Sequence, residues 1–210
     1  MVRDKLRIRF KKHRDLRLIS HHDLMRCFER MLRRAALPFH STEGFNPKPR
    51  MAFALSLALG IEGHQEVVEL ELDEELPPEQ VHERLAQQAP AGLDILSVRR
   101  VPTKTRAQPR AAVYRVPVPD ERRAELPARV QALLGEEHLW VERTRPQPRR
   151  LDLRPYLRGL RLSPEGLDIE LTVTPTGTAR PEEVLQLLGL GDLLEAGAVL
   201  QRITLELTDE

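Results

Sequence analysis

Two adjacent histidines are the side chains in this sequence best suited to acid–base chemistry. His21 and His22 follow Ser20, at the predicted start of a helix. A histidine titrates close to neutral pH, so either ring could act as a general base or acid. One reaction open to such a group without a metal is RNA cleavage, in which the imidazole activates a 2′-hydroxyl. The alternative is that one ring packs or caps the helix while the other is solvated.

Cationic side chains surround these histidines, along the predicted helix and into the loop that follows. Residues 20–50 read SHHDLMRCFERMLRRAALPFHSTEGFNPKPR. Arginine binds phosphate in a bidentate manner and stacks on exposed bases, and each neutralised phosphate releases counterions. We therefore expect an RNA-binding surface, whose candidate contacts are Arg26, Arg30, Arg33, Arg34, Phe45, Asn46, Lys48 and Arg50. The alternative is a solvated helix face beside a connecting turn.

A second basic segment lies at residues 143–161, where seven Arg stand against one acid. Tyr156 within it could stack on a base. The candidates of this second patch are Arg149, Arg150, Arg154, Tyr156 and Arg180. The alternative is a surface excursion that pairs with the acidic remainder of the chain.

The distribution of charge supports a polyanionic partner. Residues 1–60 hold 14 Lys or Arg against 5 Asp or Glu, and residues 61–210 hold 19 against 27, although the whole chain carries only +1. Such a division indicates a basic face on an otherwise acidic body.

Several other function classes find no support in the sequence. The lone Cys27 and the scattered histidines do not supply a structural zinc site, and no nucleotide-binding glycine loop is present. We therefore predict neither a metal site nor a cofactor. Because there is no secretory signal and no apolar run of about 18 residues, we expect a cytoplasmic protein that does not enter a membrane.

The elements that must position the first cluster follow from hydrophobic periodicity. Residues 5–19 alternate, which predicts a strand with Leu6, Ile8 and Phe10 inward and a solvent-exposed cationic face on the other side, with a hairpin-like bend possible at Arg14-Asp15. A helix with an apolar stripe is expected from Ser20 to about Leu37, capped by the Ser20 hydroxyl. Two strands, a helix and a final strand follow before residue 98. This order is the split βαβ pattern of a ferredoxin-like domain.

The predicted fold class is α+β, with two ferredoxin-like units, the first over residues 1–98. Residues 99–111 are expected to form an exposed linker, and residues 112–210 a second α+β domain of similar pattern. Within that domain we expect a helix over 121–134, which Pro127 could divide, and an irregular segment over 146–166.

The motifs SHHDLMR and EGFNPKPR, within residues 10–72, resemble the radical SAM-linked protein family, a bacterial domain of unknown function. The later runs LDLRPYL and TARPEEVLQLLGL fit the second half of that family. The resemblance implies a partner, a B12-binding-type radical SAM protein that is encoded beside the domain or fused to it. It implies no activity and no site residues. The chain has no CxxxCxxC motif, so it is not itself expected to be the radical SAM enzyme.

Three hypotheses remain open at this point. The first is an RNA-binding accessory protein that presents rRNA or tRNA to a separate radical SAM enzyme. The second is a metal-independent endoribonuclease that uses His21 or His22. The third is an adaptor whose basic face binds an acidic protein.

Overall fold

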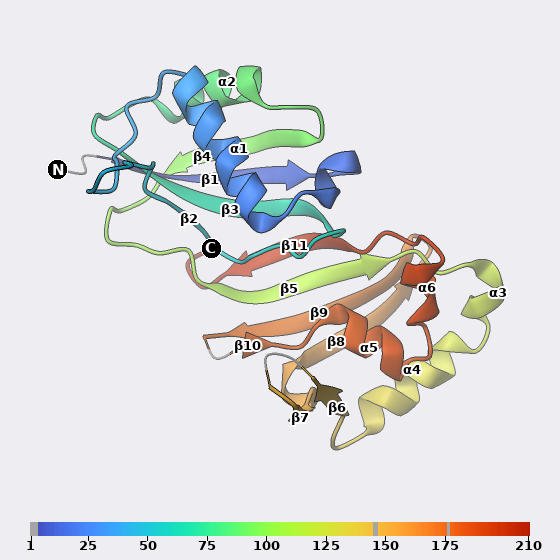
Figure 1. Cartoon of the computed structure of the whole chain (residues 1–210). Helices are drawn as coiled ribbons and strands as arrows, with labels where there is room; N and C mark the ends of the chain where they lie inside the picture. Colours follow the sequence, from blue (N-terminus) through green and yellow to red (C-terminus); the bar gives the residue numbers. More distant parts are fainter. Residues whose placement is uncertain (1–3, 145–146, 176) are drawn as a thin grey trace. The chain divides into compact units, whose positions relative to one another are not determined.

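The protein folds as two compact units, seen here in a computed structural model that describes residues 4–144, 147–175 and 177–210 (Figure 1). Unit 1 comprises residues 1–109 with 207–210, and unit 2 comprises residues 110–206. Both contain helices and strands, which confirms the predicted α+β class. Within the described ranges, no helix is long and apolar enough to cross a membrane.

Unit 1 follows the predicted order of strand, helix, two strands, helix and strand. β1 pairs with both β3 and β4, the short β2 pairs with β3, and every pairing is antiparallel. The elements are β1 (Asp4–Lys12), η1 (Arg14–Leu18), α1 (His21–Arg34), β2 (Met51–Phe53), β3 (Glu62–Leu72), α2 (Pro78–Gln88) and β4 (Leu93–Arg100). β1 ends at Lys12, and a 3-10 turn begins at Arg14, a residue with a φ of 54°, where the sequence allowed a bend.

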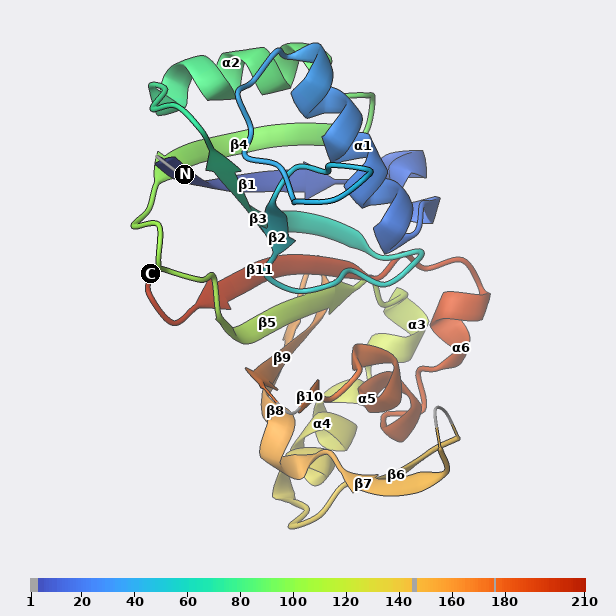
Figure 2. The same ribbon diagram turned by 60° about the vertical axis from the view of Figure 1, so that its left-hand side comes forward.

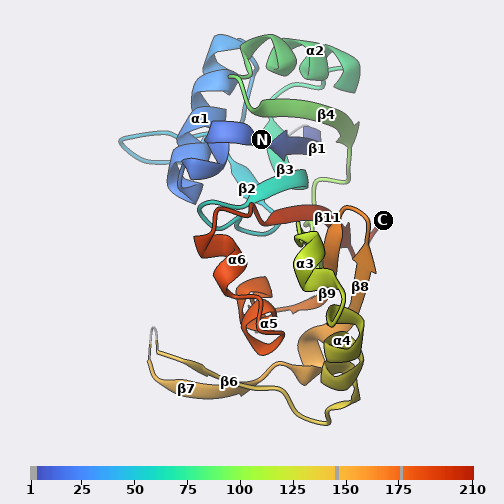
Figure 3. The ribbon, with the colours of Figure 1, turned by 90° about the vertical axis from the view of Figure 1, so that its right-hand side faces the viewer.

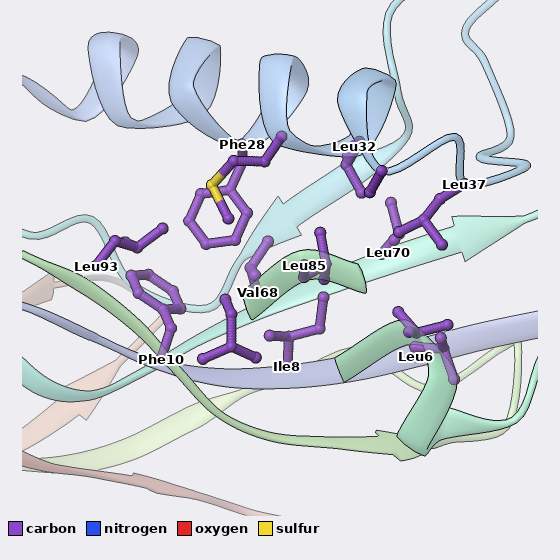
Figure 4. Packing of buried hydrophobic residues seen from close by; sticks show 14 of the residues in the cluster. Leu6, Ile8, Phe10, Phe28, Leu32, Leu37, Val68, Leu70, Leu85 and Leu93 are labelled. Carbon is purple, nitrogen blue, oxygen red and sulfur yellow. The ribbon is translucent and has the colours of Figure 1, made fainter. Parts of the chain in front are cut away.

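The core of unit 1 lies between its sheet and the two helices. Leu6, Ile8 and Phe10 of β1 point toward α1, as their alternation predicts, and Phe28 packs edge-to-face on Phe10 at 4.9 Å between ring centroids (Figure 4). Burying one such side chain stabilises the fold by about 1.5–3 kcal/mol. This packing fixes the rotation of α1 about its axis, and therefore which of its residues remain exposed.

The opposite side of β1 corrects one prediction. Lys5 and Arg7 are only 5% and 1% exposed, so the expected solvent-facing cationic strand does not exist. Glu69 of β3 lies 2.9 Å from Lys5 Nζ and 2.8 Å from Arg7 Nη2, and Asp209 lies 2.8 Å from Arg7 Nη1. Burial opposes the charge of Arg7, but hydrogen bonds to Asp209 and Glu69 outweigh it and raise the pKa of Arg7. These charges stabilise the fold and are not available to a ligand.

Unit 2 contains a larger set of strands. β9 pairs with β5, β8 and β10, and β5 lies between β9 and β11. β6 and β7 form a separate two-stranded ribbon (Figure 3). The strands are β5 (Pro109–Val116), β6 (Trp140–Arg143), β7 (Arg149–Asp152), β8 (Leu157–Ser163), β9 (Gly166–Thr174), β10 (Gly177–Thr178) and β11 (Gln201–Leu207). The helices are α3 (Asp120–Arg123), α4 (Leu126–Gly135), η2 (Arg154–Tyr156), α5 (Pro181–Leu187) and α6 (Asp192–Glu195).

For unit 2, the structure agrees with one sequence prediction and contradicts another. The predicted helix over 121–134 is divided into α3 and α4, with Pro127 in the first turn of α4. The prediction of an irregular segment over 146–166 is wrong, because β7 and β8 lie within it. A register shift between Leu157 and Gly159 breaks the period of two in β8, which is why its alternation is hidden.

Candidate functional site

The start of α1 is fixed by its cap. The Ser20 hydroxyl accepts a hydrogen bond from the Asp23 N–H at 3.1 Å and donates one to the Asp23 carboxylate at 2.7 Å. The bond from this hydroxyl also lowers the pKa of Asp23. The cap therefore places His21 and His22 in the first turn, as the sequence predicts.

The loop at residues 41–50 is tied back on itself and onto α1 (Figure 2). The Thr42 N–H donates to the Lys48 carbonyl at 2.8 Å, and the Lys48 N–H donates to Thr42 Oγ1 at 3.1 Å. Arg33 of α1 donates to the Pro47 carbonyl at 3.2 Å. Gly44, at a φ of 126°, allows the turn, and Phe45 at the tip is fully exposed.

A cavity of about 440 Å³ lies where α1, this loop, β2 and β3 meet. Its lining contains cationic side chains, carboxylates and the thioethers of two methionines. The lining residues are Lys5, His22, Met25, Arg26, Glu29, Thr42, Lys48, Pro49, Arg50, Met51, Ala52, Glu69 and Glu71. We call this space the helix–loop cavity.

Three cations of the helix–loop cavity keep their charge available. Arg26 is exposed and only loosely paired, with 3.4 Å between its Nη1 and Asp23 Oδ1. Arg50 Nη1 lies 3.8 Å from Glu71 Oε2, beyond hydrogen-bond distance. Lys48 is exposed and has no ion pair with any residue that the structure describes. Lys5, by contrast, is buried against Glu69.

The remaining predicted contacts are divided between two directions. Arg33 supports the loop, and Arg34 donates to the Gln88 carbonyl at 3.1 Å, on the side of α2. Arg30, four residues before Arg34, is exposed on the same side of the helix. Asn46 is exposed beside Phe45 at the loop tip. Of the predicted RNA-binding residues, only Arg26, Lys48 and Arg50 line the helix–loop cavity.

The two histidines lie in different surroundings. His22 is exposed and lines the helix–loop cavity. His21 is half-buried against Phe53, at 5.1 Å between ring centroids, and its Nδ1 has no hydrogen-bond partner among the described residues. Burial lowers the pKa of His21, and the nearby His22 and Lys12 add to this effect. The lowered pKa of His21 favours the neutral ring that a general base requires, but no described group forms a hydrogen bond with its Nδ1.

The second basic patch has mixed roles. Arg154 donates from its guanidinium to the carbonyls of Glu136, Leu157 and Leu134, so it holds the end of α4. Arg149 and Arg150 are exposed on β7, whereas Tyr156 is half-buried and Arg180 is exposed at the start of α5. The Arg150 guanidinium stacks over the ring of Trp140, 4.3 Å from its centroid, which gives the β6–β7 ribbon an aromatic residue absent from the prediction.

Sequence reasoning also missed the acidic and sulfur-containing lining of the helix–loop cavity. Glu69 and Glu71 alternate with Leu70 and Leu72, so their common face could be read from the sequence. Their position across from Lys5 and Arg7 depends on the β1–β3 register, which local patterns do not fix.

Fold and site together define an α+β protein whose first unit carries a charged helix–loop cavity. The chain belongs to the family described as "Uncharacterized protein conserved in bacteria" (DUF2344), which it matches over residues 5–183. No curated protein matches it. A crystal structure of an unknown protein from Galdieria sulphuraria is similar over 98% of each chain, with 14% identity and a TM-score of 0.30.

Proposed function

We propose that this chain is a non-catalytic RNA-binding protein that works beside a separate radical SAM enzyme in rRNA or tRNA modification or processing. The observation that supports RNA binding is the meeting of Arg26, Lys48 and Arg50 at one cavity. The enzyme partner rests on the resemblance of the SHHDLMR and EGFNPKPR motifs alone.

Single-stranded RNA suits this surface better than a duplex. Cations on one helix and one loop can follow a phosphate chain, and the exposed Phe45 beside them can stack on an unpaired base. Asn46 adds an amide for a base edge or a ribose. The buried pairs of Lys5 and Arg7 remove those two cations from the contact.

The number of available cations predicts a modest salt dependence. Three phosphate contacts to a single strand give a slope of about −2 in a plot of log affinity against log salt concentration. Changing Arg26 and Lys48 together to Gln should reduce the slope to about −0.7 and weaken binding at low salt. Fluorescence anisotropy with a labelled oligoribonucleotide at several salt concentrations measures both quantities.

A matched control removes the same charge elsewhere in unit 1. Lys104 and Arg106 are exposed and do not line the helix–loop cavity. Their joint change to Gln should leave the slope near its original value. Equal effects of the two double variants, or undiminished affinity at low salt in the Arg26 and Lys48 variant, would reject this site.

Phe45 provides a second measurement that does not depend on charge. Stacking on one base contributes about 1–3 kcal/mol, so Phe45→Ala should weaken binding by about fivefold or more with an unchanged salt slope. A parallel change in slope would mean that the loop itself has moved.

The partner is tested separately. The protein is treated with nuclease to remove RNA and is then used to capture the radical SAM protein encoded by the same bacterium. Capture that persists without RNA, from a chain that has no affinity for RNA, would favour the protein-only adaptor instead.

A second candidate function, metal-independent RNA cleavage, is favoured by the presence of His22 in the same cavity as the cations. Incubation of the chain with cellular RNA in EDTA tests it. Cleavage must occur and must be lost in His21→Ala or His22→Ala, or this candidate is removed.

A further inference from the structure

The helix–loop cavity contains a carboxylate that a simple phosphate site would not need. Glu69 is committed to Lys5 and Arg7, and Glu29 Oε1 lies 3.2 Å from Arg33 Nη2. Glu71 has no such partner: Arg50 stands 3.8 Å away, and Glu71 Oε2, an atom buried in this arrangement, makes no hydrogen bond to any described residue. A carboxylate oxygen that lacks a hydrogen-bond donor favours a ligand that supplies N–H groups.

The backbone holds Glu71 in a fixed position. Its N–H donates to the Arg50 carbonyl at 3.1 Å, and its own carbonyl accepts from the His40 N–H at 2.8 Å. The neighbouring Leu70 and Leu72 are buried in the core. The carboxylate is therefore presented by a rigid strand, with 24% of the side chain exposed.

The walls around this acceptor suit a flat heterocycle. Met25 of α1 and Met51 of β2 line the same cavity. Thioethers adapt their shape and make favourable contacts with aromatic rings. Arg50 is about half exposed, so its guanidinium has room to turn toward a phosphate and uncover the carboxylate of Glu71.

We propose that the helix–loop cavity binds an unstacked guanine base of single-stranded RNA, whose N1–H and N2 amino group donate to the Glu71 carboxylate. This inference rests on the proposed RNA binding and names the base that the site selects. Arg26 and Lys48 hold the adjoining phosphates, and Phe45 stacks on a neighbouring base.

The pairing edges of the four bases explain the choice. Guanine presents two adjacent N–H donors on that edge, which match the two oxygens of one carboxylate. Adenine and cytosine place a ring-nitrogen acceptor beside their amino group, and uracil flanks its single N–H with two carbonyls. Each of these acceptors would be repelled by Glu71.

The test compares oligoribonucleotides that carry a single guanine or a single inosine, which lacks the N2 amino group. Losing one hydrogen bond to a charged acceptor should weaken binding by about tenfold or more. Glu71→Gln should abolish this preference, whereas Glu43→Gln, which removes one charge from the exposed part of the loop, should keep it. Free guanosine monophosphate serves as a competitor.

The outcomes separate this inference from the function on which it rests. Guanine preference that disappears only in Glu71→Gln supports it. RNA binding that depends on Arg26 and Lys48 but treats guanine and inosine alike overturns the inference and leaves the proposed function standing. Competition by guanosine monophosphate at concentrations equal to those of RNA would show a free-nucleotide site and overturn RNA as the ligand. Failure to bind any RNA removes both.

Discussion

Changing Glu69 to Gln should destabilise unit 1 more than any other conservative change at the helix–loop cavity. Glu69 is 2% exposed and is shared by Lys5 and Arg7, which are themselves buried. Gln keeps the shape but removes the carboxylate that pairs with Lys5 and one of the carboxylates that pair with Arg7. Breaking such a pair from one side costs about 3–5 kcal/mol, because Lys5 is left buried without a carboxylate, although Arg7 keeps Asp209.

Hydrogen exchange read by mass spectrometry measures this loss in unit 1 alone. Amides of β1 and β3 that exchange only by global opening should exchange about two to three and a half orders of magnitude faster in Glu69→Gln. Peptides from β9 in unit 2 provide an internal reference. A denaturant midpoint for the whole chain would be less informative, because two units need not unfold as one.

The neighbouring Glu71→Gln is the matched control. It changes the same group on the same strand, but its nearest cation is 3.8 Å away and about half exposed, so less than about 1 kcal/mol is expected. Replacing Lys5, Arg7 and Glu69 together by apolar residues of similar volume should cost less than Glu69→Gln alone. Equal protection in the two single variants, or a triple variant that is the least stable, would refute this account.

Two further predictions concern local structure. Ser20→Ala should destabilise the first turn of α1 by about 1 kcal/mol, which faster amide exchange in that turn would show. The same change should raise the pKa of Asp23, because the hydrogen bond from the Ser20 hydroxyl is lost. Unchanged amide exchange would show that the cap is not needed. Hydrogen bonds from the Leu139 N–H and His138 lower the pKa of Asp152 from 3.8 to about 2. Because the folded pKa is depressed, this carboxylate stabilises unit 2 above pH 3.8 and the contribution is lost as the pH falls toward 2. Trp140 lies opposite Asp152 in the β6–β7 ribbon, so its fluorescence reports on this part of unit 2. Urea unfolding followed by this fluorescence should show stability falling with pH in the wild type and falling less in Asp152→Asn.

Local signals in the sequence were sufficient for α1 and for its cap. Ser20, Asp23 and the apolar spacing of Leu24 and Phe28 lie within one short segment, so helix start and buried face could both be predicted. The alternation of β1 was also visible. Alternation alone distinguishes the two faces of a strand, but it does not determine whether the polar face is exposed to solvent.

The buried charges of β1 depend on residues far away in the sequence. Arg7 contacts Glu69 across a strand pair and contacts Asp209 in the turn that follows β11. Nothing near Arg7 indicates either contact. The same reason explains why the cavity could be predicted only in part: the cations of α1 and its loop were local, whereas Glu71 required the pairing of β2 with β3.

The contact between Arg7 and Asp209 has a consequence for the order in which the protein matures on the ribosome. Residues 207–210 join unit 1 only after the whole of unit 2 has been synthesised. Until then the Arg7 guanidinium has Glu69 but not Asp209, so the nascent first unit holds an incompletely neutralised cation. The Arg7–Asp209 ion pair can therefore form only after residues 110–206 have been synthesised.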